Sequence, residues 1–102
     1  MITMEEVKPL CTDETLVLTT HVRERMKKRG IEYSDLLFAV SNGEIIEQYK
    51  DDNPYPSCLV LGHTANNRPL HVVVSIGSGV LWVITSYCPA PEKWKKNFSE
   101  RR

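Results

Sequence analysis

The spacing of the apolar residues changes at Gly43, and this change divides the chain into a helical part and a strand-rich part. Before Gly43, apolar side chains recur every three or four residues between turn-forming residues. After it, they alternate or run in short continuous stretches, as they do in strands. We expect strands near residues 44–50, 57–63, 69–76 and 80–88. Short connections join them, so neighbouring strands should be antiparallel.

The first expected helix follows a short apolar run at residues 16–18. Thr19 or Thr20 can accept a backbone N–H as its N-cap, and the helix should continue to about Arg29. Gly30 ends it, because glycine readily adopts the left-handed conformation that follows many helices.

A second helix and a short C-terminal helix are also expected. Ser34 can cap the second helix, and residues 42–43, Asn-Gly, should close it in the left-handed conformation that both residues tolerate. Residues 92–98 should form a helical turn or two, with Trp94 and Phe98 four positions apart and docked on the domain.

The expected fold is α+β: two N-terminal helices packed on a small, mainly antiparallel sheet of four to five strands, with a short C-terminal helix. A chain of 102 residues has room for one core, so residues 16–102 should form a single domain behind a loose lead-in at residues 1–15. No stretch approaches the roughly 20 apolar residues that a membrane span needs. The acidic start at residues 4–6 is unlike a signal peptide, so we expect a cytoplasmic protein without membrane contact.

Charges are balanced in number but separated along the chain. Residues 21–29 hold five basic side chains against Glu24, and residues 93–102 add further basic ones. Residues 32–52 are mainly acidic. Such a surface can serve RNA on one side and a partner protein on the other. Solvated faces without any ligand are the open alternative.

The motifs of most enzyme classes are absent. Cys11, Cys58 and Cys88 are widely spaced and form no metal-binding motif, so we expect reduced thiols and no metal or cofactor. No Gly-rich phosphate loop, paired carboxylates or nucleophile elbow is present either. These absences leave metal-free acid–base chemistry on a phosphodiester, or no chemistry at all.

The last two expected strands form a hairpin that carries His71. Leu70, Val72, Val74 and Ile76 should share one face with Val80, Trp82 and Ile84 of the next strand.

A three-residue loop at residues 77–79 would set His71 opposite Thr85 on the other face, with Tyr87 diagonal to it. This group is a candidate catalytic floor: His71 can transfer a proton near neutral pH, and Tyr87 can donate a proton or stack on a base. A satisfied structural histidine and a half-buried packing tyrosine are the alternatives.

The first expected helix carries a second candidate group. His21 and Arg25 are four residues apart, and Lys28 and Arg29 complete the same side. An imidazole and two or three cations projecting together can grip a phosphate, with Arg25 best suited to a bidentate contact. Pairing of Arg25 with a surface carboxylate is the alternative.

The ordered series of these motifs resembles a known family. The motifs are His21-x-x-x-Arg25-Met26-x-x-Arg29-Gly30-Ile31, Asn42-Gly43-x-Ile45-Ile46-Glu47-x-Tyr49, Pro54-x-Pro56-Ser57, Pro69-Leu70-His71-Val72-Val73, Ile84-Thr85-x-Tyr87-x-Pro89 and Trp94. Together they resemble the bacterial and archaeal family catalogued as domain of unknown function 4258. The likeness spans roughly residues 16 to 98.

The resemblance implies a distant relation to the RelE and MqsR messenger-RNA interferase toxins, and hence a RelE-like fold and a zinc-binding antitoxin partner of the MqsA type. Such toxins cut RNA without metal, when a ribose 2′-hydroxyl attacks the adjacent phosphate. On this chain, Arg25, Lys28 and Arg29 would then hold phosphate, while His71 would move the proton with help from Tyr87 or Thr85.

We therefore expect a ribonuclease toxin of a toxin–antitoxin pair that cleaves mRNA, with His71, Tyr87, Thr85 and His21 as catalytic residues. Strands 57–88 carry only Arg68, fewer basic residues than RelE-like sites have. The alternative from another class is a non-catalytic protein-binding module that uses the acidic residues 32–52 or an exposed sheet edge.

Overall fold

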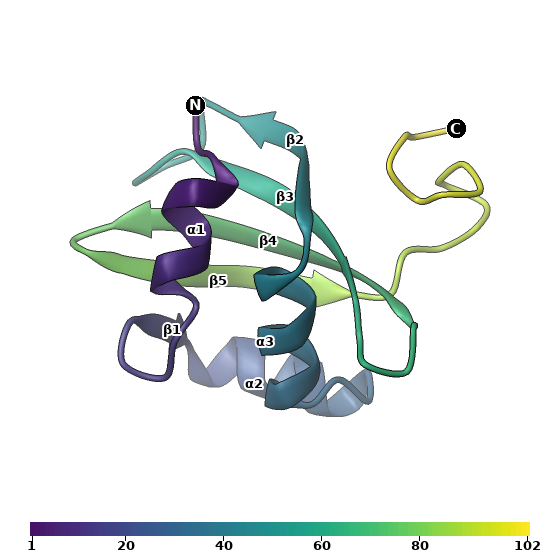
Figure 1. Ribbon diagram of the computed structural model, residues 1–102, viewed down its shortest axis with the longest axis horizontal. Coiled ribbons are helices and arrows are strands. Elements are labelled where there is room, and N and C mark those ends of the chain that lie inside the picture. The colour runs from purple at the N-terminus through teal and green to yellow at the C-terminus, as the bar shows by residue number, and fades with distance from the viewer.

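Five strands form one sheet in the order β1-β5-β4-β3-β2 in the computed structural model, which describes residues 1–102 (Figure 1). The strands are β1 (Leu16–Leu18), β2 (Glu44–Tyr49), β3 (Ser57–His63), β4 (Pro69–Gly77) and β5 (Val80–Tyr87). β1 pairs with β5 in parallel, and every other neighbouring pair is antiparallel. The mainly antiparallel sheet is confirmed, and the apolar run at residues 16–18 supplies its fifth strand.

Three helices precede the antiparallel strands: α1 (Met4–Leu10), α2 (Thr20–Lys28) and α3 (Tyr33–Ser41). The expectation of a loose lead-in was wrong, because Thr3 and Glu6 form a reciprocal capping box that starts α1. Burial of Val7 then fixes this helix to the core. α2 begins as predicted, with the Thr19 hydroxyl accepting the Val22 N–H at 3.2 Å.

Both ends of α3 differ from the prediction. The helix begins after Glu32 rather than at Ser34, because the Asp35 carboxylate accepts the Glu32 N–H at 2.9 Å. Its end is not left-handed, since Asn42 has φ −112°. Gly43 serves another purpose: a Cβ there would lie 2.7 Å from the Ala39 carbonyl oxygen, so glycine permits the close approach of α3 to the sheet.

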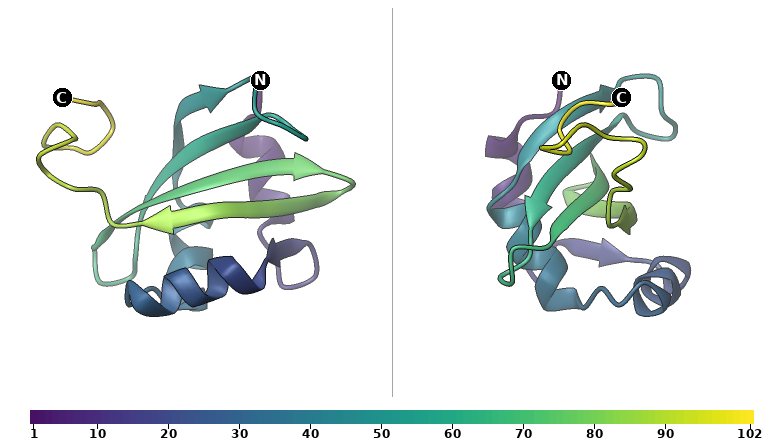
Figure 2. Two further views of the ribbon diagram at one scale, coloured as in Figure 1. Left: turned by 180° about the vertical axis from the view of Figure 1, so that it is seen from behind. Right: turned by 90° about the vertical axis from the view of Figure 1, so that its right-hand side faces the viewer.

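The helices and the chain end lie on different sides of the sheet. α1 and α3 cover one face, which we call the helix-covered face, and α2 runs along the β1–β5 edge (Figures 1 and 2). A cluster of 16 buried residues fills the space under the helices, including Leu36, Val60 and Leu70. Residues 88–102, the C-terminal segment, leave the end of β5 and run beside the ends of the strands (Figure 2). They contact the opposite face, which we call the outer face, through the bond between Phe98 and His71.

The C-terminal segment contains no helix, contrary to the expectation for residues 92–98. An isolated bridge between Trp94 and Arg101 closes it on itself instead. The Lys95 N–H donates to the Glu100 carbonyl at 2.8 Å, and the Arg102 N–H donates to the Lys93 carbonyl at 3.0 Å. These bonds, between residues five and nine positions apart, close a loop where a continuous helix was expected. Trp94 is nevertheless buried, as its docking required.

The β4–β5 hairpin has a two-residue turn, not the predicted three-residue loop. Ser78 and Gly79 both have positive φ, 54° and 76°, and Gly77 pairs with Val80. Positive φ at both positions is the geometry of a type I′ turn, whose twist matches that of the flanking strands.

This turn places Leu81 and Val83 on the helix-covered face, where Val80, Trp82 and Ile84 were expected. A bulge then leaves Ile84 without a partner and restores the predicted facing of Thr85 and Tyr87. His71 is consequently opposite Tyr87, and Thr85 is opposite Val73.

Candidate functional site

His71 lies on the outer face but is completely buried. In the sheet it stands between Leu61 of β3 and Tyr87 of β5. The Trp94 ring covers it at a centroid distance of 4.4 Å and an interplanar angle of 87°. The C-terminal segment therefore closes the space above the imidazole.

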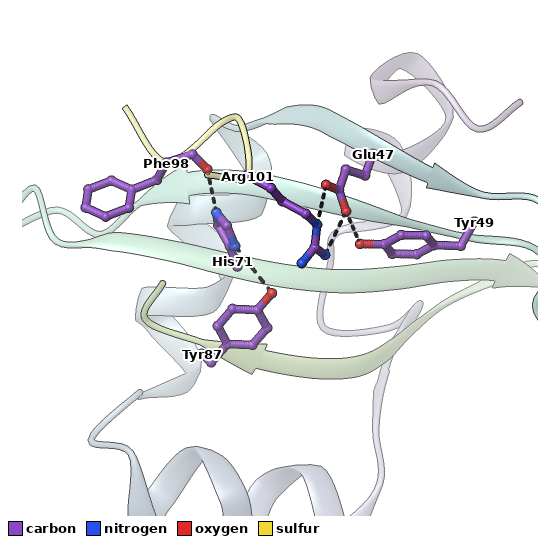
Figure 3. Close-up of polar contacts among 6 residues, drawn as sticks. All are labelled: Glu47, Tyr49, His71, Tyr87, Phe98 and Arg101. Atoms are coloured by element: carbon purple, nitrogen blue, oxygen red, sulfur yellow. Dashed lines mark hydrogen bonds and ion pairs between the residues drawn. The ribbon is translucent and has the colours of Figure 1, made fainter. Parts of the chain in front are cut away.

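Both ring nitrogens of His71 have partners (Figure 3). Nε2 lies 2.8 Å from the Phe98 carbonyl oxygen, and because a carbonyl only accepts, Nε2 carries the hydrogen. Burial lowers the pKa of His71, which favours the neutral ring and leaves Nδ1 as an acceptor. The Tyr87 hydroxyl is positioned to donate to Nδ1 at 3.4 Å. His71 thus anchors the C-terminal segment to β4.

A second polar group on the same face joins β2 to the C-terminal segment. Arg101 donates from Nε and Nη2 to the Glu47 carboxylate at 2.9 and 3.1 Å, and its guanidinium lies 4.7 Å from the Trp94 ring centroid. The Tyr49 hydroxyl donates to the same carboxylate at 2.5 Å (Figure 3). Arg101 holds the pKa of Glu47 below its usual value, whereas burial and the neighbouring Glu47 raise the pKa of Tyr49 to about 12.

A different cluster lies where α2 meets the end of β5. A hollow of about 150 Å³, which we call the α2–β5 hollow, is lined by His21, Val22, Arg25, Ile84, Thr85 and Ser86. It forms because Val22 is buried against the sheet edge while His21 and Arg25, on the neighbouring side of the helix, stay exposed. Sequence spacing predicted the helical pair, and the fold adds residues 84–86 of β5, which include the Thr85 hydroxyl.

The α2–β5 hollow carries side chains that can bind an anion. Arg25 forms no salt bridge, so the alternative of a surface ion pair is not observed. Arg29 donates from Nη1 to the Ser86 carbonyl at 2.7 Å and to the Thr85 hydroxyl at 3.4 Å, which fixes a second guanidinium at the rim. The buried hydroxyl of Ser86 has no hydrogen-bond partner. Such an orphaned group is uncommon in a folded protein. Ser86 lies opposite Val72 of the apolar cluster, so its side chain faces the helix-covered side of β5 while that of Thr85 faces the outer side.

The predicted site residues therefore fall into two groups. His21, Arg25 and Thr85 line one hollow with Arg29 beside them, while Lys28 is exposed outside it. The second group is His71 with Tyr87, which lie within hydrogen-bonding distance of each other while His71 also binds the Phe98 carbonyl.

Sequence reasoning missed four contributors: Glu47, Ser86, Trp94 as the cover of His71, and Arg101. Glu47 and Tyr49 were visible as an acidic–aromatic pair two residues apart, and therefore on one face of a strand. No local signal pointed to Arg101, because its partner is 54 positions away.

No group of three or more His, Cys, Asp or Glu side chains converges as a metal site would require. None of the helices is long and apolar enough to cross a membrane.

Comparison with known proteins places the chain in a family without assigning it an activity. No curated protein and no solved structure matches it. The family described as "Domain of unknown function (DUF4258)" matches residues 18–87, which is more than half of the chain. This stretch begins at the end of β1 and stops at Tyr87, so it holds the α2–β5 hollow and His71 but not the C-terminal segment. The chain therefore belongs to the DUF4258 family.

Proposed function

We propose that the chain is a metal-independent endoribonuclease that cleaves mRNA and acts as the toxin of a toxin–antitoxin pair. One observation carries the proposal: His21, Arg25, Thr85 and Ser86 line a single hollow, with the Arg29 guanidinium fixed at its rim. Imidazole, guanidinium and hydroxyl groups around a common space are the groups that RNA cleavage without a metal requires.

The exposed residues divide the chemical work. Arg25 and Arg29 bind the oxygens of the scissile phosphate, and Lys28 adds positive charge outside the hollow. His21 takes the proton of the ribose 2′-hydroxyl as its oxygen attacks phosphorus. The bond from phosphorus to the 5′-oxygen breaks, this oxygen takes a proton from water, and the protonated His21 returns its proton to the hydroxide that remains. The products are a 2′,3′-cyclic phosphate and a 5′-hydroxyl.

His71 and Tyr87 take no part in the cleavage step while the C-terminal segment is docked. With the C-terminal segment docked, the His71 imidazole is buried and bonded to Phe98, so no substrate reaches it. Proton transfer by His71 stays a prediction for a state in which that segment has withdrawn. In the docked state its contribution is to hold Trp94 and Phe98 in place.

The test uses purified full-length protein and a single-stranded RNA in the presence of EDTA. Cleavage with 2′,3′-cyclic phosphate ends is expected, and His21→Ala and Arg25→Ala should each slow it by about 100-fold or more. Arg23→Ala, an exposed arginine on the same helix outside the hollow, and His63→Ala, another exposed histidine, are the matched controls. Intact RNA together with normal growth of expressing cells would contradict the proposal.

A non-catalytic protein-binding module is the second candidate. The sheet order leaves β2 at one edge, and the exposed acidic residues Asp51 and Asp52 follow it after Lys50. A partner chain, such as a zinc-binding antitoxin of the MqsA type, can add a strand at an edge of this kind. This candidate predicts that His21→Ala and Arg25→Ala leave the biological effect unchanged, whereas Asp51→Lys with Asp52→Lys abolishes co-purification of the partner.

A further inference from the structure

A second hollow lies at the end of β5, on the far side of Tyr87 from the first. It has a volume of about 320 Å³ and is lined by Tyr87, Cys88, Ala90, Lys93, Trp94 and Arg101. We call it the C-terminal hollow. Two of its lining side chains are cations, two are aromatic and none is acidic. The combination of positive charge with an aromatic surface is typical of sites that bind single-stranded nucleic acid.

The cations of the C-terminal hollow are available to a ligand. Lys93 is exposed and forms no salt bridge. Arg101 uses Nε and Nη2 for Glu47, which leaves Nη1 to donate elsewhere. One carboxylate against two cations keeps the cluster positive. Arg68 adds a further positive charge beside the hollow, because its Nε donates to Cys88 Sγ at 2.9 Å.

The walls of this hollow are held in place before any ligand binds. The Glu47 carboxylate and the Trp94 ring fix the plane of the Arg101 guanidinium. The Trp94–Arg101 bridge and the His71–Phe98 bond fix the segment that carries Lys93. A preformed site loses little conformational entropy on binding, which favours affinity.

The two hollows are neighbours along one strand. Ile84, Thr85 and Ser86 line the α2–β5 hollow, and the next two residues, Tyr87 and Cys88, line the C-terminal hollow. At about 3.3 Å per residue, Thr85 and Tyr87 are roughly 7 Å apart along β5. The guanidinium of Arg29 is bound to the Ser86 carbonyl, one residue before Tyr87. Cationic side chains therefore accompany both hollows at the end of β5.

We propose that the C-terminal hollow is a second nucleotide subsite, which binds the nucleotide adjacent to the scissile phosphate in a single-stranded RNA. Lys93 and Nη1 of Arg101 bind the phosphate of that nucleotide, and the Tyr87 ring contacts its base. The substrate is single-stranded, because a base reaches an aromatic ring only when it is unstacked from a helix. This subsite rests on the proposed function, since it extends the same cleavage site.

Binding is measured separately from cleavage with a fluorescent single-stranded oligonucleotide of 2′-O-methyl RNA, which lacks the attacking hydroxyl. Lys93→Ala should weaken binding about tenfold at low salt and reduce the slope of log affinity against log salt by about one. Lys96→Ala is the matched control, because this lysine is exposed on the same segment but lines neither hollow. It should bind like the wild type.

The outcomes separate the two proposals. Equal affinities of Lys93→Ala and Lys96→Ala, or tighter binding of a duplex than of a single strand, overturn the subsite even if the wild type cleaves RNA. Intact unmodified RNA with a retained effect of Lys93→Ala on 2′-O-methyl RNA overturns the ribonuclease and supports the C-terminal hollow as a single-strand binding site.

Discussion

The two faces of the sheet are closed by different means. On the helix-covered face, α1 and α3 bury an apolar cluster to which β3 and β4 contribute Val60, Leu70 and Val72, among others. On the outer face, a segment without helix or strand is fixed by a histidine, a tryptophan and an ion pair. One cover depends on a large apolar area and close backbone approach, and the other adds directional contacts to the burial of Leu59, Leu61 and Trp94.

This difference separates the apolar core from the candidate site within one small domain. Apolar burial is insensitive to pH and tolerates little change in shape. The contacts of the outer face depend on protonation and can be released without exposing the apolar cluster. The family match ends at Tyr87, so the cover of the outer face lies outside the matched stretch while the surface beneath it lies inside. The candidate chemistry is accordingly found at the border of the outer face, not in the core.

The largest expected effect tests the close approach on the helix-covered face. A Cβ added at Gly62 would lie 2.1 Å from the Ala39 carbonyl oxygen, which belongs to the backbone of α3 and cannot rotate away. Gly62→Ala should lower the free energy of unfolding by about 3 kcal/mol, the upper end for overpacking. Urea unfolding of both proteins measures it.

A matched glycine on the outer face supplies the control. A Cβ at Gly77 would also meet atoms at 2.2 Å, but these belong to the half-buried Tyr55 ring, which can turn aside. Gly77→Ala should cost about 1 kcal/mol or less, at the lower end of overpacking effects. Equal losses in the two variants would show that the faces do not differ in rigidity.

The sequence predicted the parts of the fold that follow from local periodicity. The four strands after Gly43 end within one residue of their expected bounds, and Thr19 caps α2. α1 escaped prediction because seven residues with an internal Pro9 give little periodicity, and only its capping box marks it. The prediction of a C-terminal helix was wrong because Trp94 and Phe98 have helical spacing, but a bridge between Trp94 and Arg101 closes the segment as a loop.

The sequence predicted most residues of the candidate site, but not which of them lie together. Placing His71, Thr85 and Tyr87 on one face was correct, although their register depended on a two-residue turn and a compensating bulge that alternation alone does not reveal. The joining of His21 and Arg25 to Thr85 required tertiary structure. Nothing local indicated that residues 88–102 would fold back over His71.

A smaller effect is expected when the anchor of the outer face is removed. His71→Ala leaves the Phe98 carbonyl without its donor and should lower the unfolding free energy by about 2 kcal/mol at pH 7.5. The loss should be concentrated in the C-terminal segment, where amide hydrogen exchange at residues 93–102 accelerates while Leu70 and Val72 stay protected. Uniform acceleration would show that the two faces unfold as one unit.

The same anchor should make docking of the segment sensitive to acid. Burial lowers the pKa of folded His71 below its ordinary value of 6.5, so the unfolded chain binds the proton first. Stability from this group is complete above pH 6.5 and falls as the pH decreases toward the lowered pKa. In a Trp82→Phe background, Trp94 fluorescence should report undocking in this range. His71→Gln, which keeps an N–H donor but cannot titrate, should remove the response.

The smallest expected effect concerns the ion pair between Glu47 and Arg101. The Arg101 side chain is 59% exposed, so water and salt screen the pair, and Glu47→Gln should cost about 0.5 kcal/mol. The lowered pKa of Glu47 implies that its contribution is present above the ordinary value of 4.5 and lost as the pH falls through the lowered one. Thermal unfolding at pH 7 in low salt should therefore distinguish the variant from the wild type, and 1 M salt should remove the difference.

The control is Glu100→Gln, which breaks the more exposed pair with Lys95 and should change nothing measurable. A loss of several kcal/mol for Glu47→Gln would mean that the outer face is as tightly closed as the helix-covered one.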